Sequence, residues 1–300
     1  MIGPKEIGGL SEPSKMPGYS FSLPAIVTCP IGAKLAAIPG TPCSGCYALK
    51  GAYAWKPVRE AQARRYALIM QAIGDFTRAK GWINALSNFL DAKEINARKR
   101  LHKVGAPSAD SLRAHYAYQA AKARLNAGAK RIVEGGKVLA EKPESRQLAA
   151  DYAQSAKVYD LVSKDEKRRV KAAVSLDNAQ HFRFHASGDI FHPYYFAMIV
   201  AVAARTPNVK FWLPTQERST VKAFIKSEGE LPVNLIVRFS SPRVDAHPMP
   251  KPGSTLLASS VSSDGSTKGS LCPAYRQGGI CGDCRACWNT AKPLITYPVH

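Results

Sequence analysis

The sequence lacks any apolar run long enough to cross a membrane, and its first residues lack the basic and then apolar pattern of a secretory signal peptide. We therefore expect a soluble, cytoplasmic protein without a membrane partner. Acidic residues are also scarce, because 22 Asp and Glu stand against 42 Lys and Arg, which gives a formal net charge of +20. A charge of this size attracts polyanions, so the expected partner is nucleic acid.

The sequence also lacks the even set of cysteines that a disulfide framework needs, since it contains seven and no secretory signal. Four lie near the end of the chain, where three of them have the spacing CxxCxxC. Thiolates so close in sequence are enough to complete a tetrahedral zinc site or to hold a [4Fe-4S] cluster. Zinc is the first choice and the cluster is the alternative. The predicted metal ligands are Cys272, Cys281, Cys284 and Cys287.

A second and smaller group of cysteines lies in a Pro- and Gly-rich stretch near the N-terminus. Cys43 and Cys46 form one CxxC pair, and Cys29 precedes them. Three thiolates leave a fourth coordination position without an obvious protein ligand, so a bound iron there would be free to bind a small cofactor. We predict a second metal site at this stretch. A structural site completed by a distant histidine is the alternative.

The chain changes character along its length, which divides it into four segments. Residues 1–55 predict a first strand and a cysteine-containing loop, and residues 56–171 are Ala-rich with helical spacing. Residues 172–250 alternate strands with single helices, which implies parallel pairing through right-handed crossovers. Residues 251–300 contain a polar loop and the cysteine-rich tail.

The predicted fold class is therefore α/β. We expect a partial or complete parallel (β/α) TIM-like barrel with a basic helical insertion and a Cys-rich, metal-binding C-terminal tail. Within the core, residues 172–177 (AAVSLD) and residues 181–189 (HFRFHASGD) are predicted strands, and residues 255–261 (TLLASSV) are a candidate for one more.

Polar side chains follow the predicted strands, at the edge where a parallel sheet places its site. Asp189 follows a run of small residues, and Asp177 ends the strand before it. Two carboxylates at neighbouring strand ends would share the catalytic work, and His185 is suited to proton transfer. The alternative is that Asp189 caps the next helix and Asp177 closes a turn. The predicted substrate-binding residues are Ser187, Gly188, His192, Gln216 and Arg238.

Clusters of cations lie in the helical segment, at residues 97–103, 129–137 and 164–171, with tyrosines interleaved between them. Cations contact phosphates without sequence preference, and aromatic faces stack on unpaired bases. A solvated basic surface over a tyrosine-containing core is the plain alternative. The predicted nucleic-acid-binding residues are Arg98, Lys99, Arg100, Lys130, Arg131, Lys167, Arg168 and Arg169.

Several motifs carry a resemblance to a known family. They are SFSLPA, CSGCYALKG, FRFHASGDIFHPYY, ARTPNVKFWLPTQ and CGDCRACW. The sequence resembles the phage gene product 88 family over most of the chain outside its helical middle. It is also similar to a broader group of phage three-cysteine, radical-SAM-like proteins. The resemblance implies a protein of the cytoplasm of an infected bacterial cell, but the family name implies no reaction.

The phage setting and the strand-end aspartates suggest a likeness to phage DNA-guanine transglycosylases, which are parallel barrels with a zinc site near the C-terminus. That likeness implies a pentosyltransferase that exchanges guanine in DNA for a 7-deazaguanine co-substrate. Asp189 would attack C1′, Asp177 would assist proton transfer or base recognition, and Gln216 would read the base. The target base would have to leave the duplex stack. The chain departs from the related tRNA enzymes in having CxxCxxC where they have CxCxxC.

Two alternatives to base exchange stay open. A radical-SAM-like enzyme would hold a [4Fe-4S] cluster and S-adenosylmethionine at Cys29, Cys43 and Cys46, and would act on a nucleic-acid base. Those enzymes carry CxxxCxxC after their first strand, whereas the first gap here is thirteen residues. The other alternative is a metal-stabilised DNA-binding protein without catalysis.

Overall fold

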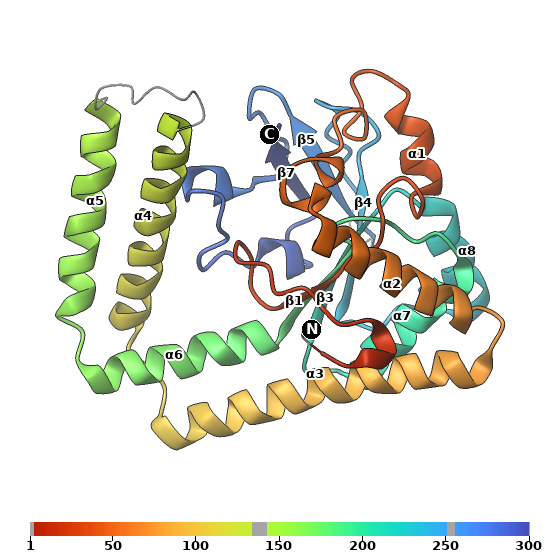
Figure 1. The fold of residues 1–300 in the computed structure, drawn as a ribbon, viewed down its shortest axis with the longest axis horizontal. Helices are drawn as coiled ribbons and strands as arrows, with labels where there is room; N and C mark the ends of the chain where they lie inside the picture. Colours follow the sequence, from red (N-terminus) through yellow and green to blue (C-terminus); the bar gives the residue numbers. More distant parts are fainter. Residues whose placement is uncertain (1–2, 134–142, 251–255, 300) are drawn as a thin grey trace.

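The computed structural model describes residues 3–133, 143–250 and 256–299. Within these residues, the chain forms one sheet of seven strands in the order β1-β2-β3-β4-β5-β7-β6. The sheet lies at the centre of the molecule (Figure 1). The strands are β1 (Tyr19–Phe21), β2 (His181–Phe184), β3 (Lys210–Thr215), β4 (Leu235–Ser240), β5 (Leu257–Ser262), β6 (Ser270–Leu271) and β7 (Leu294–Pro298).

Each pair of neighbouring strands in this sheet is parallel, and from β1 to β5 the strands follow one another in chain order. This confirms the predicted parallel α/β class, including the candidate strand at residues 255–261, which corresponds to β5. Among the described strands, β1 and β6 each have one neighbouring strand only, so a closed barrel is not confirmed. Because all strands point the same way, their carboxyl ends form a single edge of the sheet.

The helices supply the crossovers and a separate arm. In the described residues, none of them is both long and apolar enough to span a membrane. The helices are α1 (Pro30–Ala36), α2 (Lys56–Ala72), α3 (Phe76–Val104), α4 (Ala109–Val133), α5 (Pro143–Asp160), α6 (Lys164–Ala179), α7 (Pro193–Arg205) and α8 (Arg218–Glu228).

The strand predicted at residues 172–177 is wrong, because α6 continues through them to Ala179. Ser163 caps this helix, since its hydroxyl accepts a hydrogen bond from the Glu166 amide at 3.1 Å. Val170 and Ala179 are buried along the same helix. A short apolar run such as AAVSLD does not separate a strand from a buried helix segment, and here the cap upstream determines the outcome.

The two faces of the sheet carry different side chains because consecutive strand residues point in opposite directions. Phe182 and Phe184 of β2 are fully buried in the main core, together with Tyr195 of α7. On the opposite face, Trp212 of β3 packs edge-on against Trp288 of the tail, with ring centroids 5.4 Å apart. The cysteine-rich tail therefore covers part of the face that the main helical core leaves open.

Helices α4 and α5 pack together as a hairpin that stands away from the sheet, and α6 leads from this hairpin to β2 (Figure 1). The tail runs between the hairpin and the sheet. Gly278 of the tail has a φ of +68°, and a Cβ there would lie 2.4 Å from the carbonyl carbon of Ala123 in α4. Glycine at this position allows the tail to contact the backbone of the hairpin directly.

Candidate functional site

The polar residues after β2 and β3 meet at the carboxyl edge of the sheet. Asp189 is 6% exposed. Its Oδ1 accepts hydrogen bonds from the Ile190 amide at 2.7 Å and from the Thr215 hydroxyl at 2.5 Å, and its Oδ2 accepts one from the Gln216 amide at 2.8 Å. Thr215 is the last residue of β3. The Asp189 carboxylate therefore connects the turn after β2 to the end of β3.

The Asp189 carboxyl titrates far from its ordinary range. Burial raises its pKa to about 7, against the hydrogen bonds from Gln216, Thr215 and Ile190, which lower the pKa. A carboxyl with a pKa near neutrality holds and releases a proton at physiological pH. Its two oxygens already accept hydrogen bonds inside the protein, so proton transfer suits it better than attack on a substrate.

The loop that follows β1 carries Cys29, Cys43 and Cys46, and hydrogen bonds hold it on the same edge. The Asp189 amide donates to Thr28 O at 2.9 Å, next to Cys29. Glu217, which follows β3, accepts from the Ile31 amide at 2.7 Å, at the start of α1. The Tyr47 hydroxyl, next to Cys46, donates to Ala186 O at 2.6 Å. These contacts place the first cysteine group beside Asp189.

The thiols of this first group lie close to one another and to the Asp189 carboxylate. A Cβ on Gly32 would lie 3.0 Å from Cys29 Cβ, 3.7 Å from Cys43 Sγ and 3.9 Å from Cys29 Sγ, so the glycine allows the start of α1 to pack closely against both cysteines. Burial and the charge of Asp189 raise the pKa of Cys29 to about 12. Burial, then the charges of Cys46 and Asp189, raise the pKa of Cys43 to about 11.

The thiols of the tail converge in the same way. Burial and the charges of Cys287 and Cys272 raise the pKa of Cys281 to about 12, and Cys284 acts on it in the same direction. The pKa of Cys287 is raised by burial to about 11, and its sulfur lies 3.1 Å from the Tyr297 hydroxyl. The four cysteines of the tail thus come together on one face of the sheet.

Neither group is already arranged as a set of metal ligands. Within residues 3–133, 143–250 and 256–299, no group of three or more His, Cys, Asp or Glu side chains has a metal-binding arrangement. The mutual effects on the thiol pKa values nevertheless show that the members of each group lie within electrostatic range of one another. Metal binding at these two cysteine groups therefore stays a prediction from the sequence.

Arg238 lies away from the edge, although the sequence places it among the substrate-binding residues. It is fully buried in β4, on the face of the sheet that the tail covers, and its guanidinium donates only to backbone carbonyls in the described structure. The prediction that it contacts a substrate is wrong, because burial and these bonds make it an anchor for the tail. The acceptors are Ala258 O (3.4 Å), Ala286 O (3.1 Å), Cys287 O (2.9 Å), Asn289 O (2.8 Å) and Lys292 O (2.8 Å).

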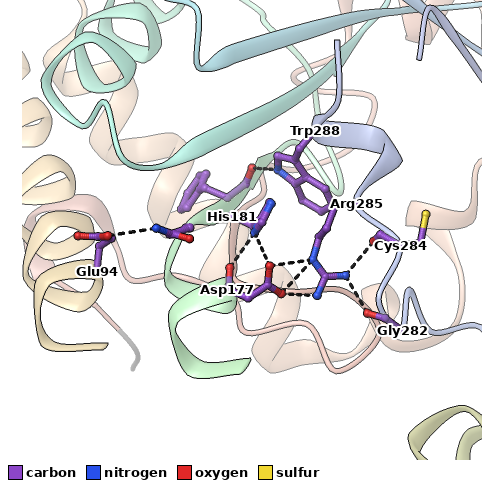
Figure 2. A network of polar contacts seen from close by, with 9 residues as sticks. Glu94, Asp177, His181, Gly282, Cys284, Arg285 and Trp288 are labelled. Carbon is purple, nitrogen blue, oxygen red and sulfur yellow. Dashed lines mark hydrogen bonds and ion pairs between the residues drawn. The ribbon is translucent and has the colours of Figure 1, made fainter. Parts of the chain in front are cut away.

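Asp177 lies at the opposite end of β2 from Asp189, because it belongs to the last turn of α6, which ends at Ala179 just before that strand begins. Arg285 Nε donates to its carboxylate at 3.0 and 3.2 Å. Arg285 Nη1 also donates to Gly282 O at 2.7 Å and to Cys284 O at 2.8 Å (Figure 2). Asp177 therefore holds the tail, and the prediction that the two aspartates sit at neighbouring strand ends is wrong.

The same network continues into the sheet and the helices. His181 Nδ1 lies 2.7 Å from Asp177 O, and the Trp288 indole donates to Phe182 O at 2.9 Å (Figure 2). Gln180 donates to the buried Glu94 of α3 at 3.2 Å. The tail, α6, β2 and α3 are thus joined at one place by hydrogen bonds between residues far apart in sequence.

The predicted histidines have structural contacts. His185 is buried, and its Nε2 lies 3.1 Å from the Tyr195 hydroxyl. Burial lowers its pKa to about 3, with the positive charge of Arg183 acting in the same direction, so the imidazole is neutral near pH 7. This argues against His185 as a general acid. His192 caps α7 by accepting from the Tyr194 amide at 3.1 Å.

Ser187, Gly188 and Gln216 do lie around Asp189, but their polar groups bond within the protein. The Ser187 hydroxyl donates to Leu23 O at 2.8 Å, and the Gln216 side chain donates to Ser241 O at 3.2 Å. Gly188 has a φ of +82°, and a Cβ there would lie 2.6 Å from Thr28 Oγ1. The glycine therefore allows the cysteine loop to pack directly against the turn after β2.

The predicted nucleic-acid-binding residues lie at one end of α3 and α6. The Ser108 amide donates to Glu166 Oε2 at 3.2 Å, which brings the two helix ends together. Arg98 pairs with Glu94, and Arg169 pairs with Asp165 at 2.9 Å. The charges of those two arginines are therefore partly neutralised by carboxylates of the same helix. In the described structure the group consists of Arg98, Lys99, Arg100, Lys167, Arg168 and Arg169, while the side chains of Lys130 and Arg131 lie outside the described residues.

The prediction missed Glu217, Arg183 and Tyr297. Glu217 follows Gln216, which the sequence predicts to bind substrate, but no motif or spacing pointed to the carboxylate of Glu217 itself. Arg183 occupies the centre of the FRF motif in β2, where a cation between two buried phenylalanines is itself unusual. Tyr297 lies in β7, which begins after the tail and was not predicted as a strand.

The fold and the site define a class: a parallel α/β protein with a cysteine group at the carboxyl edge of its sheet and a second in a C-terminal tail. The family model described as gene product 88 matches residues 3–116 and 141–290, and the chain belongs to this family. Comparisons with the curated proteins and with the solved structures gave no significant match.

Proposed function

We propose that the chain is an iron–sulfur enzyme of the radical-SAM-like kind that modifies a nucleic-acid base. One observation carries the proposal. The loop after the first strand brings Cys29, Cys43 and Cys46 to the carboxyl edge of a parallel sheet, where ligand sites of such sheets lie. The neighbouring Asp189 has a pKa of about 7, which suits a group that moves a proton.

The residues present fit a cluster at this position. Three thiols are soft ligands that suit iron–sulfur clusters, and a set of three leaves one iron free for a small molecule. Gly32 lies next to Cys29 and Cys43, and without a side chain there the backbone of α1 approaches both cysteines closely. When bound, a cluster of this kind supplies single electrons to a molecule held on its free iron.

The chain itself would position and protect that molecule. Glu217 fixes the start of α1 through the Ile31 amide, and Tyr47 fixes the CxxC pair through Ala186 O. Asp189 would exchange a proton with the bound molecule, because it lies on the same edge and titrates near neutral pH. A hollow of about 690 Å³ lies between this loop and α2, with Val27, Tyr53 and Arg59 among its lining residues.

The tail would carry a second metal. Cys272, Cys281, Cys284 and Cys287 offer four thiols, which suits either a zinc ion or an auxiliary cluster. Because Arg238 and Arg285 bind the backbone of the tail between and after these cysteines, the second metal would have a structural role. The net charge of +20 and the exposed cations of α3 and α6 support nucleic acid, with DNA as the expected form, as the substrate.

Base exchange is the second candidate, because Asp189 does lie at the strand edge and four tail thiols suit zinc. It has less support, since Asp189 is buried with both oxygens bonded and Asp177 is paired with Arg285 at the other end of β2. A 7-deazaguanine exchange would therefore depend on Asp189 alone. Release of guanine from DNA that stops in Asp189→Ala would favour this candidate over the first.

Metal analysis of matched variants tests the proposal. The chain would be purified without oxygen, reconstituted with iron and sulfide, and compared with Cys43→Ser and Cys284→Ser. We expect iron, sulfide and a broad absorbance at about 400 nm. We also expect Cys43→Ser to lose one cluster and the reductive cleavage of S-adenosylmethionine while the tail metal remains. Zinc as the sole bound metal, or unchanged iron content in Cys43→Ser, would contradict the proposal.

A further inference from the structure

One cation on the face of the sheet that the tail covers lacks the full set of hydrogen-bond acceptors that the buried Arg238 has. The guanidinium of Arg183, in β2, lies over the ring of Trp212, with its carbon 4.3 Å from the ring centroid. Its Nη2 donates to the Tyr47 hydroxyl at 3.2 Å and to His185 O at 3.4 Å. Its Nε is buried and has no hydrogen-bond partner in the described structure.

A comparison with Arg238 shows why this is unusual. The Arg238 guanidinium donates through Nε, Nη1 and Nη2 to backbone carbonyls. Within the described residues, Arg183 uses Nη2 alone, and no Asp or Glu forms an ion pair with it. Arg183 as a whole is partly exposed, but a donor atom such as its Nε that is buried without an acceptor is costly to the folded protein. The free donors of Arg183 therefore indicate that a bound anion completes the position.

The surroundings of Arg183 indicate what kind of anion fits. The rings of Tyr47 and Tyr53 lie 5.6 Å apart, and the Tyr47 hydroxyl accepts a hydrogen bond from Arg183 at 3.2 Å. Arg183 and Tyr297 remain partly exposed, although both belong to strands inside the sheet. Flat aromatic faces stack on a planar base, and a guanidinium binds phosphate through two parallel hydrogen bonds.

The position also lies between the two cysteine groups. Tyr47, which contacts Arg183, directly follows Cys46, and Tyr297 contacts Cys287 at 3.1 Å. Trp212, whose ring lies under the Arg183 guanidinium, also stacks on Tyr297 with ring centroids 6.4 Å apart, which brings Arg183 to the side of the sheet where Cys287 lies. A molecule bound at Arg183 would therefore lie on the face of the sheet that the tail covers, next to the first cysteine group.

We propose that Arg183 anchors the phosphate of a nucleotide that binds between the two cysteine groups, with the rings of Tyr47, Tyr53 and Trp212 beside it. The location rests on the proposed function, in which this edge holds the substrate. The binding itself does not depend on turnover. The phosphate belongs either to a free mononucleotide or to the backbone of a single-stranded oligonucleotide, and both sources present the same chemistry to Arg183.

Titration of the full chain with small ligands tests the proposal, with tryptophan fluorescence as the readout because Arg183 stacks on Trp212. The probes are 5′-dGMP, deoxyguanosine and a short single-stranded oligodeoxynucleotide. We expect dGMP or the oligonucleotide to bind at least about tenfold more tightly than deoxyguanosine, since a charged hydrogen-bonded pair is lost without the phosphate. Tighter binding of dGMP identifies a free nucleotide, and tighter binding of the oligonucleotide identifies a backbone phosphate.

Variants assign the effect to this residue. Arg183→Gln should weaken phosphate-dependent binding by about tenfold or more, and Arg243→Gln, which removes the same charge at an exposed position, should leave it unchanged. Arg183→Lys keeps the charge and is the variant to use if Arg183→Gln does not fold. It should weaken binding several-fold, because an ammonium does not make the paired contact. Binding by Arg183→Gln or Arg183→Lys equal to that of the unchanged chain would overturn the inference.

Metal content measured on the same samples separates the two proposals. Phosphate binding that depends on Arg183 in a chain without iron would support this inference and contradict the iron–sulfur function. A chain that loads iron normally and binds dGMP equally well with and without Arg183 would contradict this inference alone. Equal binding of deoxyguanosine and dGMP by the unchanged chain would also contradict it.

Discussion

The two cysteine groups are held to the same sheet by different chemistry. The loop with Cys29, Cys43 and Cys46 is attached by the Glu217 carboxylate, the Asp189 backbone amide and the Tyr47 hydroxyl. Its surface exposes apolar side chains, with Val27 63% and Trp55 66% exposed. The tail is attached by the buried guanidinium of Arg238 and by a second arginine paired with an aspartate. The difference predicts that the tail is the more firmly attached of the two, and the proposed function assigns the chemistry to the loop.

The strongest way to break this comparison is to remove the anchor of the tail. In Arg238→Gln, carbonyls of the tail and of β5 lose their donor, and each buried unpaired acceptor costs about 1–3 kcal/mol. We expect a loss of about 4 kcal/mol in the free energy of unfolding, since water relieves part of the cost. Urea denaturation measures it, with Arg243→Gln as an exposed control. A loss below about 1 kcal/mol would mean that the tail is not anchored by Arg238.

The contact between the loop and the turn after β2 is the next test. Gly188→Ala places a Cβ 2.6 Å from Thr28 Oγ1 at a φ of +82°, whereas Gly74→Ala meets nothing within 4 Å at a φ of +84°. Both pay the cost of the left-handed backbone, about 1 kcal/mol. Gly188→Ala should lose about 2 kcal/mol more, because of overpacking. Equal losses in the free energy of unfolding would show that the loop does not press on this turn.

Protonation of His185 should destabilise the folded chain in acid, opposite in sign to the effect of Asp189, whose raised pKa favours the folded state as the pH falls. Its pKa is about 3 in the folded chain and 6.5 when unfolded, so the folded state binds fewer protons between these values. The stability it contributes is complete above pH 6.5 and is lost as the pH falls, by at most about 1.4 kcal/mol per pH unit. His185→Asn, which tolerates the positive φ, should remove the His185 contribution to this slope, and the exposed His102→Gln should leave the slope unchanged. Unfolding free energies between pH 7 and pH 4.5 provide the check, and an unchanged slope in His185→Asn would refute it.

The smallest expected effect is that of the pair between Asp177 and Arg285. Both side chains are partly buried, so the pair should contribute about 1 kcal/mol. A double-mutant cycle with Asp177→Asn and Arg285→Gln isolates this coupling from the bonds that Arg285 also makes to Gly282 O and Cys284 O. A coupling energy near zero would leave Arg238 as the main attachment of the tail.

Part of the fold was open to prediction from the sequence. The alternation of strands and helices between His181 and Ser240 predicts parallel pairing, because each connection is long enough for a crossover helix. β7 was missed, since LITYP is short and follows a tail whose cysteines dominate the local pattern. The run AAVSLD was misassigned, because its helix depends on the cap at Ser163, several residues before it.

The sequence predicted some residues of the candidate site, but it did not predict which groups their side chains contact. Asp189 was selected because it follows a strand that ends in small residues, and the structure does place it at the carboxyl edge. Arg238 was selected for the same edge, but its side chain is buried under the tail on one face of the sheet. Position along a strand predicts the face of a side chain only when the register and both covering layers are known.

The sequence by itself determined which thiols belong together and that the core is parallel α/β, because close spacing and strand–helix alternation are local properties. The tertiary structure alone decided that Asp177 binds Arg285, 108 residues away, and that Arg238 binds the tail while Arg183 keeps free donors. The physical reason is that the burial of a side chain and its hydrogen-bond partners depend on residues that only folding brings together.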